Sequence, residues 1–341
     1  MPIVPLPERV RAFELDPAMP SGALPIFGEY LDRLGDTANR RLVAGFFLVF
    51  GVAQFVAGAG VALPVGTFAL AGSIEAWWQY RAYAHVPETR LKREAFRRVD
   101  ITADGLVAAG RTVGVRLPDG RWLRVRLDEA HRLLVAGHRR VWLLGRGPKV
   151  FVGLSGLVRV RRARIHDAPP PGAMPVPEPA GSGSPRLDPV VTAHRRQLAR
   201  DLRATAAFLL LLAGFAAWVA LGFPVVGWAA WPFGAGALLG ALAAVLRSFA
   251  HYRPLPADHW TELRAVLDGP VRMSRRGFAR LSGLTMLADG RVVRFRLPKA
   301  DPSMAANIAA TGRLWIAGAP RPGAAKTGVP GYPVLGTVWL G

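Results

Sequence analysis

The chain has 341 residues, of which 51% are hydrophobic, and its formal net charge is +21. Its apolar residues concentrate in two blocks and most of its charge lies outside them, a distribution typical of membrane proteins and not of strongly basic soluble ones. The absence of cysteine excludes a disulfide framework, a thiolate metal site and a cysteine nucleophile.

Residues 1–40 form an N-terminal arm with one amphipathic pattern. Its apolar residues recur at helical spacing: Ile26, Phe27, Tyr30, Leu31 and Leu34. A helix of this kind lies on a membrane surface or docks on a folded unit, and the sequence leaves both alternatives open. The first residues lack the charged and apolar regions of a cleavable signal peptide.

Two stretches, 41–81 and the apolar part of 189–247, are each long enough for two membrane spans of about 20 residues. Each is expected to form a helical hairpin, because a bilayer cannot satisfy irregular backbone groups. The sequence thus predicts four transmembrane helices in two closely packed hairpins, with a homo-oligomer as a further expectation. Arginines flank both blocks and the turns carry no charge. The positive-inside rule therefore predicts a multi-pass inner-membrane protein with both termini in the cytoplasm.

One basic segment occurs twice after these blocks. LPDGRWLRVRL at 117–127 returns as LADGRVVRFRL at 287–297. Two further pairs of matching segments, 81–85 with 247–251 before it and 140–145 with 313–318 after it, occur in the same order. Such matches indicate an internal duplication. The predicted fold class is membrane α-helical plus α+β, in which each hairpin precedes a small cytoplasmic sheet or partial-barrel unit. These units would span 82–165 and 248–341, with a Pro/Gly/Ser linker at 166–188.

Local signals place elements inside each unit. The motif L-x-D-G-R predicts a tight hairpin turn, because Asp-Gly accepts the positive φ that such turns need. A short helix should follow each hairpin, beginning at the capping residues Asp128 and Asp301. A further helix is predicted before each sheet, over 87–98 and 256–267.

Several residues are candidates for function. Glu75 is a carboxylate inside the first block, so it suggests proton relay, with pairing to an interfacial arginine as the structural alternative. His85 and His251 occupy matching places after the two blocks. They suggest pH sensing or headgroup contact, or merely hydrogen bonding at a helix end. Alternation along the repeated strand predicts a basic outer face formed by Arg124, Arg126, Arg294 and Arg296.

No catalytic, cofactor-binding or metal-binding constellation is visible in the sequence, since the histidines form no ligand pair. We therefore expect a non-enzymatic, membrane-anchored scaffold or regulatory module whose duplicated domains bind a protein partner or the anionic inner leaflet. The alternatives are a transporter or channel-associated subunit, a cytoplasmic-face binder of nucleic acid or anionic lipid, and a membrane-bound enzyme. Nucleic acid is the less favoured ligand, because lipid contact and topology already account for the arginines.

Overall fold

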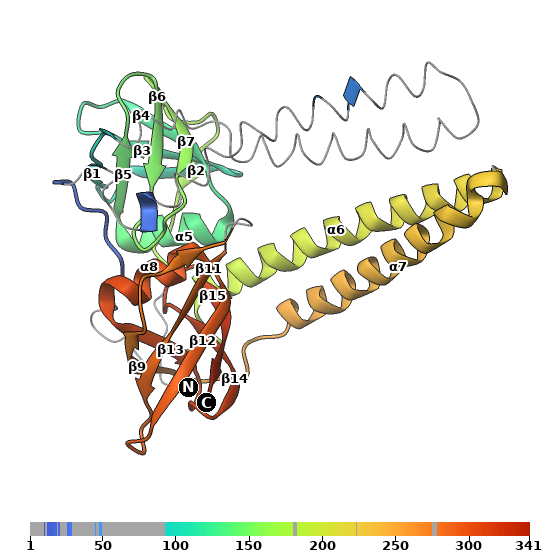
Figure 1. The fold of residues 1–341 in the computed structure, drawn as a ribbon. Helices are drawn as coiled ribbons and strands as arrows, with labels where there is room; N and C mark the ends of the chain where they lie inside the picture. Colours follow the sequence, from blue (N-terminus) through green and yellow to red (C-terminus); the bar gives the residue numbers. More distant parts are fainter. Residues whose placement is uncertain are drawn as a thin grey trace. The chain divides into compact units, whose positions relative to one another are not determined.

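We analysed a computed structural model, which describes residues 10, 12–18, 20, 26–28, 45, 48, 49, 93–179, 183–222, 224–274 and 278–341 (Figure 1). This part of the chain is mostly β and contains two sheets. It divides into a β unit, which holds both sheets, and a helical unit, whose described residues lie mainly in 198–253.

The predicted four-helix membrane fold is wrong for this chain. Fifteen of the nineteen labelled elements in the described residues are strands, and only two described helices are long and apolar enough to cross a membrane. The composition of the apolar blocks dominated the prediction, whereas most of the described elements are short strands. The predicted hairpin at 41–81 lies outside the described residues except for positions 45, 48 and 49.

The first sheet has eight strands in the order β1-β5-β6-β7-β4-β3-β2-β8, with antiparallel neighbours. The strands are β1 (Arg97–Asp100), β2 (Leu106–Ala109), β3 (Thr112–Arg116), β4 (Trp122–Arg126), β5 (Arg140–Leu144), β6 (Lys149–Gly153), β7 (Arg161–His166) and β8 (Met174–Pro175). Helix α5 (Glu129–His138) begins where the Asp128 side chain accepts a hydrogen bond from the His131 amide, as the capping signal predicted.

The second sheet has seven strands in the order β10-β11-β12-β15-β14-β13-β9. They are β9 (Trp260–Leu267), β10 (Arg272–Met273), β11 (Ala279–Met286), β12 (Val292–Ala300), β13 (Arg313–Ala317), β14 (Gly323–Gly328) and β15 (Leu335–Leu340). A further pairing between β9 and β11 closes six of these strands into a barrel. Gly283 permits the closure, because a Cβ there would overlap the backbone carbonyl of Val266.

The two sheets share one strand order, in which β1, β5, β6, β7, β4, β3 and β2 correspond to β9, β13, β14, β15, β12, β11 and β10. The L-x-D-G-R turns confirm the hairpin prediction: Gly120 and Gly290 both have positive φ, 83° and 80°. This common topology is compatible with a duplication, which stays an interpretation. The sheets differ in closure, because only the second one forms a barrel.

The helices predicted over 87–98 and 256–267 are wrong over most of their described residues. Residues 260–267 form β9, and residues 97 and 98 begin β1, although Arg93 is helical. Burial in β9 alternates, with Leu263 and Ala265 inside and Arg264 exposed, which is the pattern of a strand. The helix predicted after Asp301 is confirmed as α8 (Pro302–Thr311), which ends at the left-handed Gly312.

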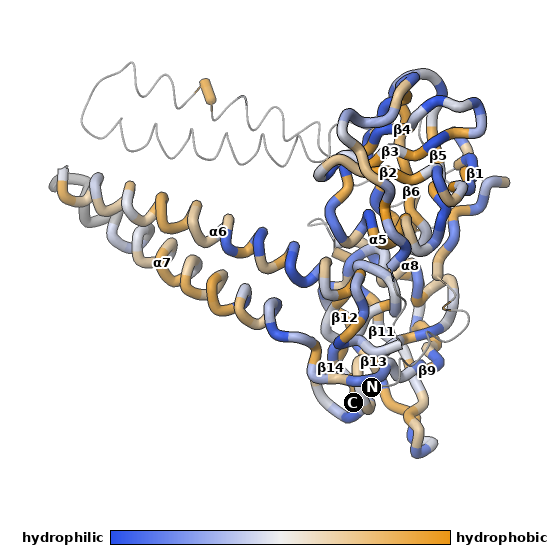
Figure 2. Tube along the Cα trace, turned by 180° about the vertical axis from the view of Figure 1, so that it is seen from behind, coloured by the Kyte–Doolittle hydropathy of each residue, from blue (hydrophilic) through white to orange (hydrophobic). Residues whose placement is uncertain are grey.

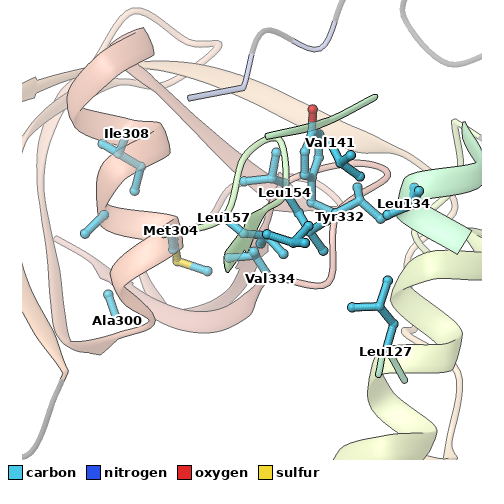
Figure 3. Close-up of a cluster of buried hydrophobic side chains, with 14 of the residues drawn as sticks. Leu127, Leu134, Val141, Leu154, Leu157, Ala300, Met304, Ile308, Tyr332 and Val334 are labelled. Carbon is cyan, nitrogen blue, oxygen red and sulfur yellow. The ribbon is translucent and has the colours of Figure 1, made fainter. Parts of the chain in front are cut away.

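Both sheets contribute to one continuous core (Figure 3). In the close-up, Leu134 and Leu157 come from the part of the chain that forms the first sheet. They lie near Met304 and Tyr332, which come from the part that forms the second sheet. Asn307 on α8 is 3% exposed and joins these segments. Its Oδ1 accepts from the Phe13 amide at 2.7 Å, and its Nδ2 donates to the Gly156 carbonyl at 2.8 Å.

The N-terminal arm is described only in part. Residues 26–28 are helical, and the Phe27 ring packs edge-on against Phe96 with 5.3 Å between the ring centroids. Both side chains are fully buried. This contact supports the docking alternative for that turn, while Tyr30, Leu31 and Leu34 lie outside the described residues.

Two long helices, α6 (Pro189–Gly222) and α7 (Pro224–Tyr252), follow the linker. The start of α6 is fixed in the β unit by Asp188: its Oδ1 accepts from the Val190 and Val191 amides, and its Oδ2 accepts from the Gly331 amide at 2.7 Å. Further along the hairpin Ala206, Ala241 and Ala244 pack together. Figure 2 shows a hydrophilic start of α6 followed by a largely hydrophobic pair of helices.

Candidate binding groove

A groove of about 920 Å³ lies on the second sheet. Residues of β10, β11, β12 and β15 line it, together with the segment that follows β9. The arginines of the groove are Arg272, Arg280, Arg294 and Arg296. Trp339, which is 55% exposed, adds an aromatic surface beside them.

Strand alternation places these side chains on the outside of the barrel. Phe295 and Leu297 of β12 are buried, so Arg294 and Arg296 between and beside them point outward. Arg296 is paired in register with Trp339 of β15. Arg294 is paired with Leu284 of β11, which is 42% exposed. The outer face therefore presents cationic and apolar groups side by side.

The groove has an excess of positive charge. Asp268 carries the one side-chain carboxylate among the described lining residues, and it accepts a hydrogen bond from the Ser282 hydroxyl at 2.9 Å. The closest Arg294 nitrogen lies 3.8 Å from the same carboxylate, and the Arg294 side chain remains 51% exposed. The four arginines and one aspartate leave a net charge of +3 for an anionic ligand to neutralise.

A hollow on the first sheet has the same count of charged lining side chains, four arginines and one aspartate, but more of its arginines are ion-paired. Arg121 there is held by Asp119, with 2.6 Å between Nη2 and Oδ2. Arg98, on the same rim, is held by Asp100 at 2.9 Å. These exposed pairs satisfy their guanidinium groups internally, so this hollow offers less free positive charge than the groove on the second sheet.

The equivalent of the groove face is covered in the first sheet. Arg124 corresponds to Arg294, and it is paired in register with Gly114 as Arg294 is with Leu284. The Arg124 guanidinium donates to the carbonyl oxygens of Ala168 and Pro169, both at 2.9 Å. The linker therefore lies across this face and uses the arginine that the second sheet leaves exposed.

The structure separates the candidates that the sequence suggested. Arg294 and Arg296 lie together in the groove, Arg124 contacts the linker, and Arg126 is exposed at the end of β4. His251 lies in the last turn of α7. The remaining two candidates, Glu75 and His85, lie outside the described residues.

Three groove residues, Arg272, Arg280 and Trp339, were missed as site residues. Trp339 carried a usable signal, because it stands between the apolar residues Val338 and Leu340 in a pattern typical of a strand. Arg280 and Arg272 had none, since the register between β10, β11 and β12 brings them to the groove.

The described residues thus combine three features: two β sheets of common strand order, a long apolar pair of helices, and a basic groove on a closed barrel. Within the described ranges no group of three or more His, Cys, Asp or Glu residues could hold a metal ion. No family model, no curated protein and no solved structure matches the chain.

Proposed function

We propose that the protein is a non-enzymatic membrane-anchored scaffold, held in a bilayer by the α6–α7 hairpin, whose β unit binds a protein partner. One observation carries the anchor: the apolar stretches of α6 and α7 are only 18% and 22% buried. A core helix of a soluble protein buries most of such a stretch, because exposed apolar surface is unfavourable in water.

The exposed side chains of this hairpin are large. Leu211 and Leu221 of α6 are 75% and 77% exposed, and Leu239 and Leu246 of α7 are 69% and 61% exposed. Lipid chains would cover these side chains, so that their apolar surface would no longer be exposed to water. Exposed arginines lie at the ends of the two helices away from their turn, at 196, 200, 203 and 247, where they suit contact with anionic headgroups.

The base of the hairpin has the contacts of an interfacial region. The Arg203 guanidinium carbon lies 4.4 Å from the centroid of the Tyr252 ring and 5.9 Å from that of Phe249. Arginine over an aromatic ring is a stable arrangement where the polarity of the surroundings changes. This cluster supports a membrane boundary near these residues.

The chain contains no cysteine, so single cysteines report local accessibility without background. We propose Leu211→Cys and Leu239→Cys as probes, with Leu187→Cys and Val266→Cys as controls that are 59% and 68% exposed. In native membranes a water-soluble maleimide should label the controls quickly. It should label the two hairpin probes only after detergent is added.

Equal labelling rates at all positions in intact membranes would refute the anchor. A second measurement guards against misfolding of a variant: each cysteine protein should float with lipid vesicles as the cysteine-free parent does. If the parent itself stays at the bottom of the gradient, the anchor is also refuted.

A further inference from the structure

Part of the linker binds to the face of the first sheet within the same chain. It leaves β7 at His166 and crosses the face of β3 and β4 before Met174–Pro175 pairs with β2 as strand β8. Pro170 is buried directly over Gly114, where an added Cβ would lie 2.6 Å from the proline Cδ. The sequence predicted a Pro/Gly/Ser linker at 166–188, and part of this linker forms strand β8 of the sheet.

The bound segment has a defined chemistry. Residues 166–178, HDAPPPGAMPVPE, contain five prolines, two carboxylates and no lysine or arginine. Proline keeps the chain extended and removes amide donors, so its recognition depends on carbonyl acceptors and ring surfaces. Arg124 supplies the donors for two of those carbonyls, and Gly114 supplies the space for one ring.

The second sheet presents the same arginine in the same register with no described segment over it. Arg294 opens into the groove, and the exposed Leu284 takes the place of Gly114 as its partner on the neighbouring strand. Trp339 lies within reach of Arg296, its register partner.

We infer that this groove binds an extended, acidic, proline-containing segment of a partner protein, in the manner in which the first sheet binds residues 168–170. The inference rests on the proposed scaffold function and names the chemistry of its partner. Arg294 donates to backbone carbonyls of the segment, as Arg124 does. Trp339 in the groove provides the apolar surface for proline rings, and the exposed Leu284 beside Arg294 extends it, since aromatic-lined grooves favour extended proline-rich chains.

Charge complementarity sets the acidic character of the partner. Arg272, Arg280 and Arg296 have no carboxylate within ion-pair distance among the described residues, whereas Arg294 shares Asp268. A segment with Asp or Glu beside its prolines would satisfy these groups with charge-assisted hydrogen bonds. Binding should therefore weaken as the salt concentration rises.

The probe is a fluorescent peptide of residues 166–178, added to the full-length protein in detergent micelles and followed by anisotropy. We expect saturable binding that weakens about tenfold or more in Arg294→Ala and about fivefold in Trp339→Ala. Arg321→Ala is the matched control: it removes the same charge from an exposed position outside the groove and should leave the affinity unchanged. Arg124→Ala tests whether the peptide exchanges with the linker, and the affinity should not fall in this variant.

A second peptide, with every proline replaced by alanine, should bind at least about fivefold more weakly. Several results would overturn the inference: no binding to the parent protein, equal losses in Arg321→Ala and Arg294→Ala, or equal affinity for both peptides. Vesicles of anionic lipid that bind in an Arg294-dependent way while the peptide does not would assign the groove to headgroups instead. Each of these outcomes leaves the maleimide test of the anchor unaffected.

Discussion

Replacement of Asn307 tests whether the junction between the two sheets depends on one buried amide. Its side chain makes three hydrogen bonds: Oδ1 accepts from the Phe13 amide, and Nδ2 donates to the Gly156 carbonyl at 2.8 Å and to the Ser303 carbonyl at 2.6 Å. Asn307→Ala removes all three and leaves the buried Gly156 carbonyl without this donor. A net value near 1 kcal/mol for each bond, together with the desolvation cost, predicts a loss of about 2–4 kcal/mol.

Two further variants sharpen this prediction. Asn307→Asp should cost more than Asn307→Ala, because a carboxylate cannot donate to the Gly156 and Ser303 carbonyls and would be buried against them. Thr311→Ala is the control on the same helix: its hydroxyl donates to the Asn307 backbone carbonyl and is only partly buried, so the loss should stay below about 1 kcal/mol.

The assay is urea unfolding of the full chain in micelles, followed by tryptophan fluorescence, with hydrogen exchange of the segment 12–18 as a local readout. The Phe13 amide should exchange faster in Asn307→Ala and stay protected in Thr311→Ala. An unfolding free energy for Asn307→Ala within about 0.5 kcal/mol of the parent, with unchanged exchange at Phe13, would refute the role of this amide.

Two other changes test the barrel and a helix cap. Gly283→Ala should lower the free energy of unfolding by about 2–4 kcal/mol and speed exchange in β9, because the new methyl group overlaps the Val266 carbonyl; an unchanged midpoint would contradict this. Burial raises the pKa of Asp128, but hydrogen bonds and charge from His131 outweigh it and lower that pKa to about 2. Since the folded pKa lies below the unfolded value of 3.8, Asp128→Asn should cost about 1–2 kcal/mol near pH 7, after allowance for partial exposure. The difference from the parent should vanish as the pH falls from 3.8 through 2, and a pH-independent difference would contradict the assignment.

Local signals predicted parts of both sheets correctly. The turns at Asp119-Gly120 and Asp289-Gly290 depend on a few neighbouring residues, and both form the expected hairpins. The helix starts at Asp128 and Asp301 are likewise local, since each carboxylate accepts from an amide two or three residues later.

Long-range pairing determined what the sequence could not predict. Residues 260–267 were predicted to be helical, yet they form β9, because β13 on one side and β11 on the other offer strand partners. Intrinsic propensity is a weak guide where such partners exist. The groove has the same origin: alternation predicts that Arg296 points outward, but only the register of β12 with β15 brings Trp339 beside it.

The hydrogen bond between Phe13 and Asn307 joins residues 294 positions apart. Synthesis from the N-terminus therefore exposes the Phe13 segment long before its partner exists, and the apolar α6–α7 hairpin emerges in between. Contacts of such sequence separation form late, because a long loop must close before they contribute. The junction of the two sheets should accordingly form last, after the α6–α7 hairpin has formed. Variants that delay the hairpin should then accumulate chains whose N-terminal segment is still open to proteases.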